Sequence, residues 1–274
     1  MMKARTIGLL MAYLLFTSTI LLATSLPCDA LTAADVEKQV KAAMGTGTAA
    51  KDAVRSAVAT AIAEGMSAKE AARAAATGAV AAALAMGRDI HPAIRGAVLG
   101  AAMGAGATGL DMNGAIEGAS EGGITAAAAA GADMQIAAQA ALCGAVRAAV
   151  EQGGNTTSAV SSAVTGVLTG ATSSGLGPEE TEKAVHGAAQ GVRAATTGQA
   201  RAAAYEALKD ALSAGARAHG LPPGSLMAAA KAGMADMGPC RGCPARKAGE
   251  RPAAMPSLAP DRVEPVPDPT ASPI

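Results

Sequence analysis

The chain has 274 residues and a balanced charge, with 22 basic and 22 acidic side chains. This balance argues against nucleic acid as a partner, because nucleic-acid-binding domains are usually strongly basic. There are two Tyr, one Phe and no Trp, and Tyr205 is the single aromatic residue beyond residue 30. Because aromatic rings provide most stacking surfaces for sugars, bases and flat cofactors, we expect no cofactor and no enzyme.

Residues 1–30 have the composition of an export segment. Lys3 and Arg5 precede an uncharged stretch that ends at Asp29. A basic start followed by an apolar run is typical of a secretory signal peptide, and cleavage after Ala30 loosely fits the preference for small residues. The run is also long enough for an uncleaved anchor, whereas a lipid anchor on Cys28 fits its preceding residues badly. We therefore predict export to the periplasm or the exterior, with membrane contact only through this segment if it is uncleaved.

Residues 31–238 are predicted to form one helical repeat domain. Glycines recur every 22 residues at Gly65, Gly87, Gly109, Gly131, Gly153 and Gly175, followed by Gly198 after 23 residues and Gly220 after another 22. Good helix N-cap residues follow the first five glycines by two positions, at Ser67, Asp89, Asp111, Asp133 and Asn155. Each unit therefore reads as a glycine that ends one helix, a one-residue linker, a cap and a new helix about 28 Å long.

The predicted helices follow from these boundaries. They cover residues 33–44, 49–64, 68–86, 90–108, 112–130, 134–152, 156–174, 178–197, 200–219 and 226–237. Thr32 and Asp35 match a capping box for the first helix, and Pro92 and Pro178 fall in first turns, where proline is tolerated. Short linkers reverse the chain, so consecutive helices should be antiparallel neighbours. The predicted fold is an all-α tandem array of about ten Ala- and Gly-rich helices, either an open solenoid or a closed bundle.

A second glycine series lies inside the predicted helices, at Gly78, Gly100, Gly122, Gly144 and Gly166. Together with alanines three and seven residues earlier, these glycines form a stripe of small side chains on one helix face. A mid-helix glycine costs about 1 kcal/mol relative to alanine, so we predict that another helix backbone packs closely on this stripe. The same spacing occurs in membrane helices and self-assembling glycine zippers, but frequent charged or polar residues argue against spanning segments.

The polar positions of each unit are expected to face solvent. Two recurring positions carry Lys69, Arg73, His91, Arg95, Asn113, Glu117, Gln135 and Gln139. The histidines His91, His186 and His219 show no paired spacing, so we expect them at the surface or at its boundary. Asn155 begins an Asn-Thr-Thr glycosylation sequon, which has meaning only in a eukaryotic secretory pathway.

Two short strings resemble catalytic motifs but lack their context. Residues 118–122 read GASEG, which matches the GxSxG nucleophile motif at Ser120, and residues 104–109 read GAGATG, which matches GxGxxG. Both motifs require a preceding β-strand, whereas helices are predicted here. We therefore expect neither a nucleophile nor a dinucleotide site. Cys143 lies within a predicted helix and is expected to be a small buried apolar residue.

Residues 239–274 are predicted to be a disordered proline-rich tail. Nine of the 14 prolines fall in these 36 residues. Cys240 and Cys243 form a CxxC pair at the start of this tail. In an oxidising compartment a local disulfide between them is the favoured interpretation; a redox pair or half of a zinc site are alternatives that lack their usual partners, so no metal site is predicted.

These patterns suggest an architecture more strongly than an activity. We expect a non-catalytic protein with a structural or interaction role in the cell envelope or exterior, acting on a protein partner or on itself. One alternative is a membrane-associating or self-assembling protein that uses its GxxxG runs. Another is a stress-related ice binder, although the threonines keep no single repeat position.

Overall fold

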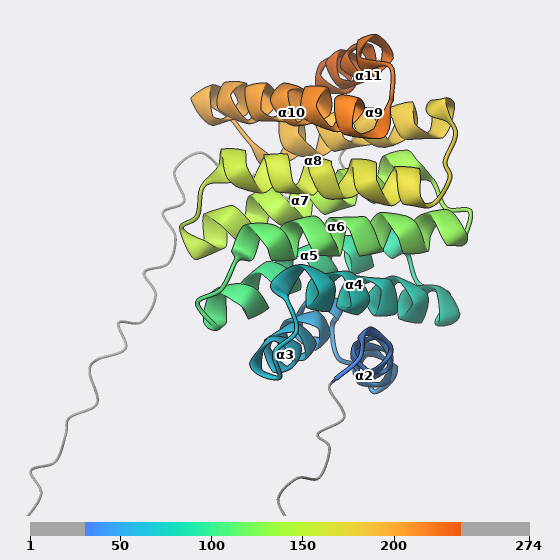
Figure 1. Cartoon of the computed structure of the whole chain (residues 1–274), viewed down its shortest axis with the longest axis vertical. Helices are drawn as coiled ribbons and strands as arrows, with labels where there is room; N and C mark the ends of the chain where they lie inside the picture. The colour runs from blue at the N-terminus through green and yellow to red at the C-terminus, as the bar shows by residue number, and fades with distance from the viewer. Residues whose placement is uncertain (1–30, 237–274) are drawn as a thin grey trace, which may run out of the picture.

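The computed structural model describes residues 31–236, in which all regular secondary structure is α-helical (Figure 1). The ten described helices are α2 (Ala33–Gly45), α3 (Ala50–Ala63), α4 (Ala68–Ala85), α5 (Ile90–Ala107), α6 (Met112–Ala129), α7 (Met134–Gln152), α8 (Thr156–Ser173), α9 (Pro178–Ala195), α10 (Gly198–His219) and α11 (Pro223–Ala235). The prediction of an all-α tandem array is confirmed. The predicted export segment, residues 1–30, and the predicted tail, residues 239–274, lie outside the described residues.

The helices form two parallel stacks. Each helix packs on the next one in the chain and, in the central part of the array, more extensively on the helix after next. Helices α2, α4, α6, α8 and α10 therefore form one stack, and α3, α5, α7, α9 and α11 form the other (Figure 1). The sequence predicts consecutive helices as neighbours, but the more extensive contacts of the central helices join helices two positions apart.

The array is open. Among the described helices, α2 packs only on α3 and α4, while α11 packs only on α9 and α10. A closed bundle would bring the first and last helices together, so the open solenoid is the form that this chain adopts in residues 31–236. Most of the described array is joined by one continuous apolar core rich in Ala and Val, with larger side chains such as Ile94, Ile116 and Leu142 fully buried.

The 22-residue glycines end the helices as predicted, through left-handed backbone. From Gly65 to Gly175 the φ angles lie between +62° and +96°. At Gly109, for example, the turn allows the N–H of Leu110 to donate to the carbonyl oxygen of Ala105 at 3.1 Å. This bond satisfies a carbonyl group that the end of the helix would otherwise leave without a partner.

Gly198 is an exception to this pattern, and its predicted role at a helix end is wrong. Helix α9 ends at Ala195, followed by Thr196 in extended conformation, and Gly198 is the first residue of α10. The side chain of Arg201 reaches back and donates to the carbonyl oxygen of Thr196 through Nε and Nη2, at 3.1 and 2.8 Å. Where the repeat is one residue longer, the Arg201 side chain thus provides hydrogen bonds to a carbonyl group at the end of α9. Helix α11 also begins earlier than predicted, at Pro223.

Most predicted N-caps make the expected hydrogen bonds. Ser67, Asp89, Asp133 and Asn155 accept backbone N–H groups of the first turn, and Thr32 with Asp35 forms the predicted capping box. Asp111 occupies the N-cap position of α6 but its side chain accepts no capping hydrogen bond.

Replacing Asp133 by Ala is expected to destabilise the fold more than replacing Asp111 by Ala. Asp133 Oδ1 accepts from the N–H groups of Gln135 and Ile136, at 2.8 and 3.3 Å, and losing such a cap typically costs about 1 kcal/mol. Chemical denaturation of both variants measures the difference. Equal losses would mean that the hydrogen bonds of Asp133 contribute nothing beyond the conformation of the N-cap residue.

The second glycine series lies where helices of one stack meet. A methyl group placed at Gly144 of α7 would lie 2.7 Å from the carbonyl oxygen of Arg95 on α5, and one at Gly78 of α4 would lie 2.8 Å from that of Glu37 on α2. A methyl group would lie still closer to a carbonyl oxygen at three further glycines of the series: to that of Lys51 from Gly100, of Arg73 from Gly122 and of Glu117 from Gly166. The small stripe of each helix therefore lies against the backbone of the helix two positions earlier, at distances that exclude a side chain.

The polar positions are less exposed than the sequence suggests. His91 is 3% exposed and Gln139 is 7% exposed, so the expectation that these positions face solvent is wrong for both. The helix after next packs on the face that carries these polar residues: Gly144 of α7 contacts the backbone of α5, the helix of His91, and Gly191 of α9 contacts the backbone of Gln139 itself. The packed backbone covers part of this face. His186 is partly buried, while His219 is exposed.

Candidate functional site

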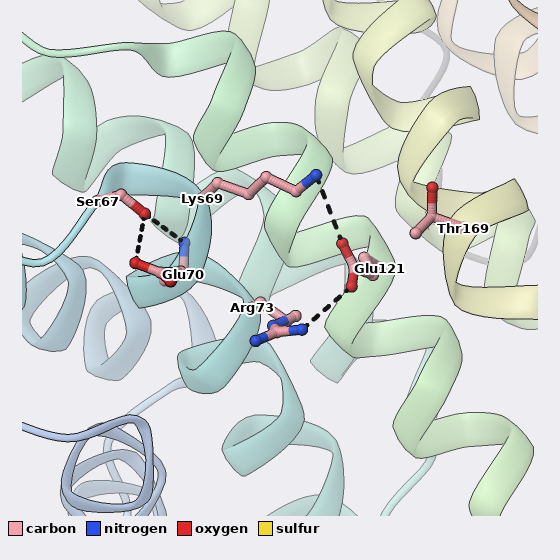
Figure 2. A pocket seen from close by; sticks show the side chains of 6 residues that line it. All are labelled: Ser67, Lys69, Glu70, Arg73, Glu121 and Thr169. Carbon is pink, nitrogen blue, oxygen red and sulfur yellow. Dashed lines mark hydrogen bonds and ion pairs between the residues drawn. The ribbon is translucent and has the colours of Figure 1, made fainter. Parts of the chain in front are cut away.

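A polar pocket lies across three helices of the first stack (Figure 2). Its volume is about 410 Å³, and it is lined by Ser67, Lys69, Glu70, Arg73, Glu121 and Thr169. Ser67 is the N-cap residue of α4, and Lys69, Glu70 and Arg73 lie in the first two turns of that helix. Glu121 lies on α6 and Thr169 on α8. The pocket therefore draws side chains from three successive levels of the stack.

Glycines determine how closely the charged groups of α4 and α6 approach each other. Gly118 and Gly122 of α6 lie against the backbone of Lys69 and Arg73 of α4, in the same order along both helices, so the two helices run parallel. Each glycine is directly preceded by a glutamate, Glu117 or Glu121. The close backbone contact thus brings both carboxylates to the two cations.

The charges form a continuous ion-pair network. Lys69 Nζ lies 2.7 Å from Glu117 Oε1 and 3.8 Å from Glu121 Oε2, and Arg73 Nη1 lies 3.4 Å from Glu121 Oε1. The side chain of Glu121 is only 10% exposed, whereas those of Lys69 and Arg73 are 44% and 52% exposed. Two cations therefore compensate the buried carboxylate while keeping exposed surface of their own.

The start of α4 is fixed by its own cap. Ser67 Oγ accepts the N–H of Glu70 at 3.2 Å and donates to Glu70 Oε2 at 2.8 Å. Figure 2 shows this pair beside the Lys69 and Arg73 side chains. Because the cap orders the first turn, the backbone that carries Lys69 is held in place by the fold itself.

Lys69 is expected to stabilise the fold in a manner that disappears at alkaline pH. Its hydrogen bond to Glu117 raises the pKa of Lys69, against a smaller opposing effect of burial. A raised pKa in the folded state means that this stabilisation is present below the ordinary lysine pKa and is lost as pH rises through the folded value. The melting temperature of wild type should therefore exceed that of Lys69→Met by a margin that is steady below the ordinary lysine pKa of about 10.4 and shrinks as the pH rises above it.

A matched variant separates this effect from general alkaline denaturation. Lys231 on α11 is exposed, and Lys231→Met should keep a constant offset from wild type over the same range. A Lys69→Met offset that also stays constant would contradict a role for the ammonium group.

The second stack carries a second polar network, in which glutamine side chains make the contacts between helices. Gln135 Nε2 of α7 donates to Gln190 Oε1 of α9 at 2.9 Å, and Gln190 Nε2 donates to Asp236 Oδ2 at 2.5 Å. The carbonyl oxygen of Asp236 accepts from Arg193, and His186 Nε2 lies 3.9 Å from Asp236 Oδ2. Here too the polar residue precedes a glycine, Gly191, which lies against the backbone of Gln139.

Neither motif-like string has the surroundings that its chemistry requires, although Glu121 of the GASEG string lines the pocket. Ser120 is fully buried within α6, and its Oγ has no hydrogen-bond partner. The GAGATG string forms the last turn of α5 and the turn after it, preceded by helix. Neither string has the strand that its chemistry requires. Within residues 31–236 no three His, Cys, Asp or Glu side chains gather in a way that would hold a metal ion.

The predicted cysteine pair lies outside the described residues, as both Cys240 and Cys243 follow residue 236. Cys143, in contrast, is described: it is 3% exposed on α7 and is disulfide-bonded. The interpretation of Cys143 as a simple buried apolar residue is therefore wrong, although its burial is as expected.

The sequence does not single out the residues of the pocket. Ser67, Lys69 and Arg73 appear in it only as a cap and as solvent-facing positions, and Glu70, Glu121 and Thr169 carry no distinctive spacing. One pattern in the sequence does correspond to the site. A glutamate precedes each of two glycines in α6, and a cationic residue lies 48 positions before each glutamate, in α4. Recognising it requires knowing that α6 packs on α4.

The chain matches no protein-family model, no curated protein and no solved structure. No helix among residues 31–236 has both the length and the apolar character needed to cross a membrane. The arrangement of charges in the pocket is therefore the most specific guide to function that the described residues offer.

Proposed function

We propose that this protein is an exported, non-catalytic helical-repeat scaffold that binds a protein partner along the side of its first stack. The observation that carries the proposal is the pocket formed jointly by α4, α6 and α8. A site that crosses consecutive levels of a solenoid suits an extended ligand, because repeat arrays present long continuous surfaces.

The chemistry of the pocket favours recognition over reaction. Lys69 and Arg73 are paired with Glu121, and the Glu70 carboxylate accepts a hydrogen bond from Ser67. The hydroxyl groups belong to a helix cap and to Thr169, and no histidine lines the pocket. Lys69 and Arg73 remain half-exposed, so carboxylate groups of a partner can share them with Glu117 and Glu121. A polar partner segment that can hydrogen-bond to Lys69 and Arg73 is the best match.

The use of the glycines supports a scaffold over a membrane-associating or self-assembling protein. Gly100, Gly118 and Gly122 already contact backbone atoms within the chain. Their stripes are therefore occupied and are not free to pack against lipid or a second copy. Export remains part of the proposal on the strength of residues 1–30 alone.

Site-specific crosslinking in the native cell tests the proposal. A photoreactive residue is placed at Thr169 in the full chain, with a control at Val150, which is 42% exposed on α7 of the other stack. We expect a discrete protein adduct from position 169 in the exported fraction, absent at position 150 and weakened by Arg73→Gln. The adduct should also weaken with added salt, because the contact is charged.

Two results would contradict this function. One is the same set of adducts from positions 169 and 150, which would indicate unspecific collision. The other is turnover of hydrolase or redox substrates by the purified protein, which would reject the non-catalytic part. Vesicle leakage caused by the purified protein would instead favour membrane action.

A further inference from the structure

Arg95 of α5 carries a charge that no carboxylate of the described array balances. Its Nη1 atom is buried and has no hydrogen-bond partner, although the residue as a whole is only partly buried. None of the ion pairs within residues 31–236 involves this guanidinium group. A charge that loses water without gaining a counter-charge is costly. The fold therefore holds a cation here without compensating it.

The first stack shows how a cation at the equivalent position is compensated. Arg73 Nη1 of α4 lies 3.4 Å from Glu121 Oε1 of α6, and this glutamate directly precedes a glycine that lies against the backbone of Arg73. In the second stack, Gly144 of α7 lies against the backbone of Arg95 in the same way. The residue before Gly144 is Cys143, which offers no carboxylate. The second stack thus repeats the cation and the close backbone contact without the anion.

A second cation lies beside Arg95. Arg147 follows Gly144 by three residues, about one helical turn, and so lies on the face of α7 that packs on α5. The pKa of Arg95 is lowered from its ordinary value, chiefly by burial and further by repulsion from Arg147. Arg147 Nε lies 2.5 Å from Glu151 Oε1. Two guanidinium groups and one carboxylate leave a net positive charge between α5 and α7.

We propose that Arg95 and Arg147 form a binding site for a small inorganic oxyanion, phosphate or sulfate, between α5 and α7. A guanidinium group presents paired N–H donors that match the oxygen atoms of such an anion. The bound anion supplies the negative charge that Glu121 supplies to Arg73 in the first stack. Because Arg95 is partly buried between two helices, a small free anion suits the site better than an anionic group on a large molecule.

The site is independent of the proposed partner-binding function. The partner-binding pocket is formed by α4, α6 and α8 of the first stack, whereas Arg95 and Arg147 lie on α5 and α7 of the second. Loss of anion binding would leave the scaffold proposal unchanged, and the reverse also holds.

Melting temperatures in phosphate test the site. Millimolar potassium phosphate is compared with potassium chloride of the same ionic strength and pH. We expect phosphate to raise the melting temperature of wild type, by roughly 3–6 °C at ten times the dissociation constant. Arg95→Gln should lose this rise and Arg147→Gln should reduce it. Sulfate should act in the same way.

Arg217 offers a control of equal charge. It is exposed on α10, and its Nε donates to the carbonyl oxygen of Ser213 in the same helix. Arg217→Gln should therefore keep the full response to phosphate. The proposal would be overturned by the absence of a rise in wild type, or by an equal rise in wild type and Arg95→Gln, which would indicate general stabilisation by an excluded salt. Equal losses in Arg95→Gln and Arg217→Gln would overturn it as an effect of net charge alone.

Stability in chloride provides a second measurement. Arg95→Met keeps a long side chain but removes the uncompensated charge, so it should melt at the wild-type temperature or above it. Arg73→Met removes a partner of the buried Glu121 carboxylate and should melt lower. An Arg95→Met protein that melts as far below wild type as Arg73→Met would mean that the fold already compensates Arg95. Because the phosphate titration begins with the wild-type chain, a missing rise there overturns the proposal even where a variant does not fold.

Discussion

Replacing Gly122 by Leu is expected to lower the melting temperature of the array by roughly 0.5–9 °C, even though leucine is the better helix former. A side chain at Gly122 would strike the carbonyl oxygen of Arg73 and lie 3.0 Å from Thr77 Oγ1. Helix propensity alone would stabilise the variant by about 0.8 kcal/mol, whereas forcing two backbones apart typically costs about 1–3 kcal/mol. The clash should win, and Gly122→Ala should already be destabilising, because the Cβ atom itself lacks space.

Matched glycines provide the control for this prediction. Gly45 at the end of α2 and Gly224 in the first turn of α11 are helical, and a Cβ at either position would meet nothing within 4 Å. Gly45→Ala and Gly224→Ala should melt at the wild-type temperature or higher. A Gly122→Ala protein that also melts higher than wild type would mean that the backbones of α4 and α6 do not approach as closely as the structure shows. Lys69 and Gln135 are unsuitable as neutral controls, because both make contacts between helices.

Replacing Leu142 by Ala is expected to destabilise the protein by about 2–5 kcal/mol, a loss of roughly 4–20 °C in melting temperature. Leu142 is fully buried on α7, and its Cβ lies 2.8 Å from where a Cβ at Gly191 of α9 would be. The glycine therefore leaves room that the leucine fills. Because most other core residues are small, neighbouring side chains can do little to refill the cavity that alanine would leave.

Leu110 offers the matched control for Leu142. It is 53% exposed at the turn before α6, so Leu110→Ala should change the free energy of unfolding by less than about 0.5 kcal/mol. Denaturant unfolding of both variants decides the question. Similar small losses for Leu142 and Leu110 would indicate that the array tolerates a cavity in α7, against the close packing described here.

The sequence alone determined where the helices begin and end. Glycines at intervals of 22 residues adopt positive φ, and N-cap side chains follow most of them, because these are local requirements of backbone conformation and hydrogen bonding. Each helix boundary depends on a few adjacent residues, so it can be read without knowing the fold. Where the local signal changed, at Gly198 and before Pro223, the predicted boundaries were less accurate.

The sequence also indicated that a stripe of small residues marks close contact, but not which helix makes that contact. Gly144 could meet α6, α8 or α5, and only the assembled array places it against Arg95 of α5. The reason is physical: the linkers make consecutive helices antiparallel in either a bundle or a solenoid, and the choice between them depends on packing summed over many helices.

The candidate site was decided by tertiary structure for the same reason. Lys69 and Glu117 are 48 residues apart, and each alone looks like a solvated side chain. Their pairing, the burial of Glu121 and the pocket beside Thr169 exist only because α4, α6 and α8 are stacked in order. The local sequence fixes each helix through its own backbone, while the site arises from contacts between residues that no local rule connects.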